Sequence, residues 1–249
     1  MKTVLITLVL MVGMAASVFA ADCKDLPSAS ALQTQLIAAP ATFGPPVIGI
    51  HGGPVGGLFE GSRMWAAIVN RDGELCSFVT STSDPTQVWP GSQAIAKAKA
   101  YTANAFSLDA LALSSAMLYT FTQPGHSLWS LGQSNLFDPE FLAAPAEKGG
   151  GAGAKKIAGG LIFFGGGVPL YKNGKIVGGL GVSGDTSCAD HEIAKRTRDL
   201  LGLNPPGGAT VDDIHYTAAN GADNFTHPLC IHTWRNSIFI GEEPPAAGY

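Results

Sequence analysis

The segment at residues 178–192, GGLGVSGDTSCADHE, brings together the residue types most able to do chemistry in this chain. Its GLGVSG part has the glycine spacing of a dinucleotide-binding loop. Its GVSG part is similar to the turn that carries the nucleophile of serine hydrolases. Its CADHE part places a thiol, an imidazole and two carboxylates side by side, a composition that can hold a metal ion. Three kinds of site therefore have to be weighed: a nucleotide loop, a catalytic serine and a metal cluster.

The elements around this segment favour a structural role instead. A dinucleotide loop needs a parallel strand that runs into a helix, whereas the strand before Gly179 is the second arm of a hairpin predicted from Asn173-Gly174. The GVSG turn lacks one residue of the GxSxG pattern. Ser187-x-x-Asp190 has the form of a capping signal at a helix N-terminus, where acidic residues suit the helix dipole. We therefore expect this segment to be part of the scaffold.

The helix predicted at residues 187–201 has two unlike sides. Its apolar stripe consists of Ala189, Ile193, Thr197 and Leu200. His191, Lys195 and Arg198 fall on the opposite side, so we expect them to face solvent or another subunit. Glu192 and Arg196 are spaced for a surface ion pair. His191 is thus a metal or cofactor ligand only if a neighbouring subunit completes the site.

The rest of the chain supplies elements for an antiparallel sheet covered by helices. Two hairpins are predicted, because Asp72-Gly73 and Asn173-Gly174 each lie between β-prone runs. The predicted strands are 64–70, 74–81, 160–164, 170–172 and 175–182, and the predicted helices are 30–38, 91–106, 108–121 and 187–201. Residues 122–156 form a long loop, a length that is often functional. The fold class is therefore α/β of the α+β type, with a five-stranded antiparallel sheet.

The first residues predict export. Lys2 precedes an apolar run that ends in Val18-Phe19-Ala20, which has small residues where a signal peptidase reads them. Cleavage before Ala21 would leave no membrane span. The four cysteines all follow this point, and an even number in an oxidising compartment favours two disulfides, whose pairing stays open. A net charge of −4 with no basic run argues against a nucleic-acid partner.

Several motifs in a fixed order carry a resemblance to a known family. They are WAAIVNRDGEL at 65–75, SQAIAKAKAYTA at 92–103, GGVPL at 166–170, and GGLGVSG at 178–184 followed by Asp190-His191-Glu192. This pattern resembles the GlcG/HbpS-like haem-binding family, which includes domains similar to the C-terminal part of PduO. The resemblance covers residues 64–203. It divides the chain into a signal peptide (1–20), an N-terminal arm (21–63), the family domain (64–203) and a C-terminal extension (204–249).

The resemblance implies a profilin-like fold, assembly into homo-oligomers, and binding of haem, with iron or a corrinoid as other ligands. Haem needs an apolar surface and usually an axial donor. His126 is our first candidate donor, because it lies between Tyr119 and Trp129 in sequence. His191 is the second. Lys97 and Lys99 are candidate partners for the haem propionates, although such lysines are more often solvated.

The sequence thus predicts an exported, haem-binding protein that sequesters haem or iron or senses redox stress. Two alternatives stay open. One is an exported structural or partner-binding domain, and the other is an enzyme that acts on a small organic acid. Because fold alone does not fix function, the family resemblance is what favours a binding protein over an enzyme.

Overall fold

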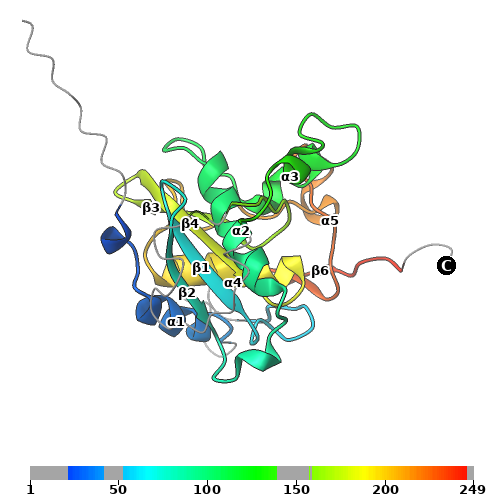
Figure 1. Ribbon diagram of the computed structural model, residues 1–249. Helices are drawn as coiled ribbons and strands as arrows, with labels where there is room; N and C mark the ends of the chain where they lie inside the picture. Colours follow the sequence, from blue (N-terminus) through cyan, green and yellow to red (C-terminus); the bar gives the residue numbers. More distant parts are fainter. Residues whose placement is uncertain (1–21, 42–52, 139–156, 158, 246–249) are drawn as a thin grey trace, which may run out of the picture.

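The computed structural model describes residues 22–41, 53–138, 157 and 159–245 (Figure 1). The predicted signal peptide, residues 1–20, lies outside the described residues. The helices are α1 (Ala29–Ala38), α2 (Ser92–Phe106), α3 (Leu131–Ser134), α4 (Ser187–Leu200) and α5 (Thr217–Asn220). The strands are β1 (Trp65–Asn70), β2 (Leu75–Thr80), β3 (Gly167–Lys172), β4 (Lys175–Ser183), β5 (Thr233–Arg235) and β6 (Ile238–Gly241). Short 3-10 turns are η1 (Cys23–Asp25), η2 (Pro85–Gln87), η3 (Ser115–Leu118) and η4 (Thr120–Thr122).

The main sheet is antiparallel and has the strand order β2-β1-β4-β3. Each of its two hairpins forms where the sequence predicts it. Asn173 and Gly174 have φ of 53° and 75°, the positive values that a type I′ turn requires. The two hairpins join in the middle of the sheet, where Trp65 of β1 lies opposite Ser183 of β4. The predicted α+β class with an antiparallel sheet is therefore confirmed.

Helices cover both faces of this sheet (Figure 1). Helix α2 packs on one face, against Trp65, Ala67 and Val69 of β1. Helices α1 and α4 pack on the other face, where Ala66 and Ile68 of the same strand enter the larger core. This alternation follows from the two-residue repeat of a strand, and it explains why all six residues of β1 are buried.

The glycines of β4 have a packing role. Helix α2 lies so close to this strand that a Cβ atom at Gly181 would overlap the carbonyl oxygen of Ala96. A Cβ at Gly179 would overlap the carbonyl oxygen of Ala100 in the same way. The glycine spacing that resembles a nucleotide fingerprint thus leaves room for the backbone of α2, in an antiparallel strand.

Two predicted elements are not formed. Residues 160–164 are not a strand, because side chains satisfy their backbone: Ile162 N donates to Thr102 Oγ1, and Phe164 O accepts from Ser115 Oγ. The main sheet accordingly has four strands rather than five. The helix predicted at 108–121 is replaced by a turn and two 3-10 segments. The hydroxyl of Ser107 closes this turn, because it donates to the carbonyl oxygen of Leu113 and accepts from the N–H of the same residue.

Two disulfides fasten the segments that flank the family domain. Cys23 pairs with Cys76, which joins the N-terminal arm to β2. Cys188 pairs with Cys230, which joins the start of α4 to the C-terminal extension. The sequence predicts two disulfides but leaves their pairing open. Thr186, rather than Ser187, is the N-cap of α4 and accepts a hydrogen bond from Ala189 N.

Candidate functional site

The polar side of α4 is buried, although its sequence predicts a solvent-facing surface. Eleven of its 14 residues are buried, and His191, Lys195 and Arg198 are at most 1% exposed. The prediction that these three residues face solvent or another subunit is therefore wrong. The covering layer comes from the C-terminal extension, which the helical pattern of α4 cannot reveal.

Ion pairs hold this covering layer in place. The guanidinium of Arg198 donates to both carboxylate oxygens of Asp212, each at 2.7 Å. The ammonium of Lys195 lies 2.6 Å from Asp213 and 2.9 Å from Glu192. Charges removed from water are tolerated only when they are paired and hydrogen-bonded in this way. Glu192 and Arg196 do approach to 3.5 Å, but as a buried pair rather than the predicted surface pair.

Lys99 and Asp190 form a second buried ion pair, at 2.6 Å. Lys99 also donates to the carbonyl oxygen of Val182, and Asp190 accepts from the N–H groups of Gly184 and Asp185. Burial lowers the pKa of Lys99 and raises the pKa of Asp190 to about 6. The pair ties α2 to the start of α4, so Lys99 is not placed to meet a ligand from solvent.

His191 and His227 lie close to this pair and are also buried. The Nε2 atom of His227 accepts from Gly165 N at 3.2 Å, and its Nδ1–H donates to the carbonyl oxygen of Pro228 at 2.7 Å. Burial lowers the pKa of His227 to about 4 and the pKa of His191 well below its usual value. Both rings are therefore neutral at pH 7.

The metal cluster weighed for CADHE is not assembled. Cys188 is in a disulfide, and the carboxylates of Asp190 and Glu192 are held by Lys99 and Lys195. Over the described parts of the chain, no group of three or more His, Cys, Asp or Glu residues is arranged to hold a metal ion.

His126 is the accessible histidine of the predicted site. It is exposed, and its ring makes no hydrogen bond, ion pair or ring contact with the described residues. Trp129 is 48% exposed, and its backbone N–H donates to the carbonyl oxygen of His126 at 3.1 Å, so both residues lie in one turn. Tyr119 points elsewhere: its ring packs on His227, with ring centroids 5.1 Å apart. The structure thus groups His126 with Trp129, whereas the Tyr119 ring packs on His227 and both His191 and Lys99 are buried.

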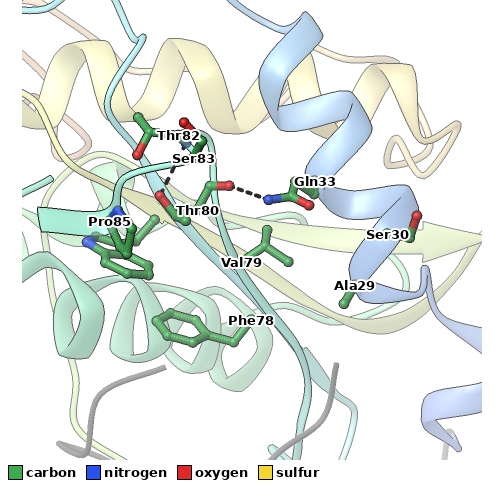
Figure 2. A pocket seen from close by; sticks show the side chains of 10 residues that line it. Ala29, Ser30, Gln33, Phe78, Val79, Thr80, Thr82, Ser83 and Pro85 are labelled. Atoms are coloured by element: carbon green, nitrogen blue, oxygen red, sulfur yellow. Dashed lines mark hydrogen bonds between the residues drawn. The ribbon is translucent and has the colours of Figure 1, made fainter. Parts of the chain in front are cut away.

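A groove that the sequence does not indicate runs along the edge strand β2 (Figure 2). Its volume is about 580 Å³, within the range of small-molecule sites. Its walls come from α1, β1, β2 and the turn that follows β2. They consist of Ala29, Ser30, Gln33, Trp65, Phe78, Val79, Thr80, Thr82, Ser83 and Pro85. The one signal available in the sequence is the pair Trp65 and Phe78. They lie on opposite arms of the first hairpin and can meet on one face of the sheet.

The chain belongs to the HbpS-like family, described as "Haem degrading protein HbpS-like", whose model matches residues 57–199. The resemblance stated from the sequence motifs is therefore confirmed. A search of curated proteins gives no match. No helix within the described residues is long and apolar enough to cross a membrane.

Three solved structures are similar to part of this chain. Protein ORFY of Klebsiella pneumoniae is 21% identical, with a TM-score of 0.41, over 57% of this chain and 76% of that one. A PduOC:haem complex is 22% identical, with a TM-score of 0.42, over 57% and 80%. A double mutant of Streptomyces reticuli HbpS is 17% identical, with a TM-score of 0.43, over 80% and 99%.

We predict that His227 makes the protein less stable in acid. Its pKa falls from 6.5 in the unfolded chain to about 4 in the fold, so the folded protein binds fewer protons between these values. The resulting stability is complete above pH 6.5 and is lost as the pH falls towards 4. Asp190, whose pKa is raised, contributes with the opposite sign, so a variant is needed to isolate His227.

The measurement is urea unfolding of the wild type and of His227→Gln at pH 7 and pH 4. We expect the difference in unfolding free energy between the two proteins to change by about 3 kcal/mol over this range. His126→Gln, at an exposed ring, serves as the matched control and should follow the wild type. Identical pH dependence in the wild type and His227→Gln would contradict this role.

Proposed function

We propose that this protein binds haem at its surface, with His126 as the axial donor. The observation that carries the proposal is membership of the HbpS-like family over residues 57–199, which supplies the ligand class. Haem chemistry in proteins is set largely by the axial ligand and by the polarity around it. Each candidate residue of this chain can therefore be assessed as an axial ligand of haem or as a contact to it.

His126 and Trp129 have the properties expected of an axial donor and of an apolar contact to haem. An imidazole must be accessible and free of competing partners to bind ferric iron, and among the described histidines His126 meets both conditions. Trp129, in the same turn, offers a half-exposed indole face against which a macrocycle can lie. When bound, haem would supply the iron centre, and this turn would orient it.

The other candidates of the sequence analysis fit less well. Lys99 is paired with Asp190 and fully buried, so it does not suit a propionate. The ammonium of Lys97 lies 4.5 Å from the centre of the Phe78 ring, and the residue is 4% exposed. His191 would become a donor only if the C-terminal extension moved away. The groove beside β2 has no His, Cys, Met or Tyr among its lining residues and thus offers no axial donor.

The test is a haemin titration followed by absorbance. We expect the wild type to give a saturable Soret shift, and His126→Ala to bind at least about tenfold more weakly with an altered spectrum, because the ligand to iron is lost. Trp129→Ala should weaken binding less. His232→Asn is the matched control, since His232 is also exposed but lies near Glu242.

The two parts of the proposal fail separately. A wild-type protein without a saturable Soret shift would contradict haem binding itself. Unchanged affinity and spectrum in His126→Ala would contradict only the choice of donor.

We further propose that the protein acts outside the cytoplasm, where it sequesters haem or senses redox stress. The two disulfides support an oxidising compartment. We expect the mature chain to begin at Ala21 and to contain no free thiol. Intact mass after alkylation without reduction tests both points, and a retained N-terminus or a modified cysteine would contradict export. Assembly into a homo-oligomer stays a prediction.

A further inference from the structure

The C-terminal extension carries a histidine that a carboxylate holds in place. Nδ1 of His215 lies 2.7 Å from one carboxylate oxygen of Asp223. The other oxygen of Asp223 accepts from Phe225 N at 2.8 Å and from the hydroxyl of Thr226 at 3.2 Å. The hydrogen bond from His215 lowers the pKa of Asp223, so this carboxylate is charged at pH 7. The pair follows the matched residues 57–199, so the family region does not include it.

The other ring nitrogen of His215 is open to solvent. The side chain is 29% exposed. Its Nε2 atom has no hydrogen-bond partner among the described residues, and it is not one of the buried unpartnered atoms, which include Nε2 of His191. When Nδ1–H donates to a carboxylate, the neutral ring presents Nε2 with a free electron pair. Histidines that bind metals are commonly held by carboxylates in this way, which fixes the tautomer and makes the imidazole a stronger donor.

Phenylalanine rings lie beside His215. The Phe225 ring meets the imidazole edge to face, with centroids 6.0 Å apart, and the Phe121 ring meets Phe225 at 5.7 Å. Both phenylalanines are partly exposed. The hydroxyl of Thr120 donates to the carbonyl oxygen of Thr226 at 2.6 Å, so that α5 lies beside the segment leading into α3 (Figure 1). An accessible imidazole thus lies next to apolar rings from two distant segments.

A single imidazole beside apolar rings suits an iron porphyrin better than a bare metal ion. Zinc and similar ions take three or four ligands from the protein. Over the parts of the chain that the structure describes, no group of three or more His, Cys, Asp or Glu residues is placed to supply them. Haem iron is already bound by the porphyrin, so the protein needs to add an axial donor and apolar contact. The ligand class that fits His215 is therefore haem.

We propose that His215 is the axial donor of a second haem site, which the C-terminal extension adds to this chain. Phe225 would contact the macrocycle, and Asp223 would be a positioning residue that orients the imidazole. The inference rests on the proposed function for its ligand class, but it uses neither His126 nor Trp129. Because the His215 side chain is only partly exposed, whereas His126 is exposed, we expect the second site to be the weaker of the two.

The experiment is a haemin titration of the full chain in the His126→Ala background, where the second site remains. We expect His126→Ala to retain a saturable Soret shift with one haemin per chain, and the wild type to take up two. His126→Ala/His215→Ala should bind about tenfold more weakly than His126→Ala, because the ligand to iron is lost. His126→Ala/His232→Asn is the matched control and should bind as His126→Ala does. His232 also lies in the extension near a carboxylate, but its ring contacts no aromatic ring of the described residues.

Asp223→Asn separates a positioning role from a merely structural one. The amide keeps the size of the side chain and an acceptor for Nδ1–H, but without the charge the imidazole donates less to iron. In the His126→Ala background, we expect about tenfold weaker binding of haemin and a higher reduction potential of the bound iron. Far-UV circular dichroism checks that each variant is folded.

The outcomes distinguish this site from haem binding as such. A wild type without a saturable Soret shift would contradict haem binding, and this site with it. A wild type that binds one haemin, or equal binding by His126→Ala and His126→Ala/His215→Ala, would overturn the second site and leave haem binding intact. An unchanged reduction potential in Asp223→Asn would overturn the positioning role.

Discussion

The close approach of α2 to β4 is the contact on which the rest of this structure depends. It is possible because Gly179 and Gly181 have no side chains where the helix backbone passes. The helix is then near enough for Lys99 to reach across the sheet to Val182 and Asp190. That reach fixes the first turn of α4, since Asp190 also holds the backbone at the end of β4. One steric condition in a strand thus sets the position of a helix on the opposite face.

The burial of α4 follows from this arrangement and limits where chemistry can occur. A helix with a charged face is stable inside a protein only if each charge finds a partner. Here the partners come from the C-terminal extension, through Asp212 and Asp213, and from the segment before β1, whose carbonyl oxygens at Gly53 and Pro54 accept from Arg196. Cys188, Asp190 and Glu192 therefore have structural roles, in a disulfide and in buried ion pairs. The proposed ligand chemistry therefore lies at the surface, where His126 is exposed.

The sequence predicts the elements whose signals are local. Both hairpins form at their Asp-Gly and Asn-Gly turns, and α1, α2 and α4 lie within a residue or two of their expected bounds. Prediction from the sequence fails where contacts with distant segments decide the local structure. Residues 160–164 are apolar enough for a strand, but hydroxyls from Thr102 and Ser115 satisfy their backbone instead.

Contacts between distant segments also limit what the sequence can predict about the candidate site. The helical pattern of α4 correctly places Ala189 and Ile193 in the core, whereas Leu200 is 37% exposed. The pattern cannot show that a turn-rich extension covers the other side. His126 was identifiable as a loop histidine near Trp129, and the structure keeps the two together. The groove was not identifiable, because it depends on how α1 docks on the edge of the sheet. Such docking is set by tertiary contacts and by a disulfide whose pairing the sequence leaves open.

We conclude that the glycines of β4 serve packing rather than ligand binding. The most direct test is the unfolding free energy of Gly181→Val in urea, with the disulfides intact. We predict a loss of at least about 2 kcal/mol, because the new side chain meets the backbone of α2. Gly91→Ala, at a glycine with open space around it and a φ of −62°, should stay within about 0.5 kcal/mol of the wild type. A Gly181→Val protein as stable as the wild type would contradict the claim.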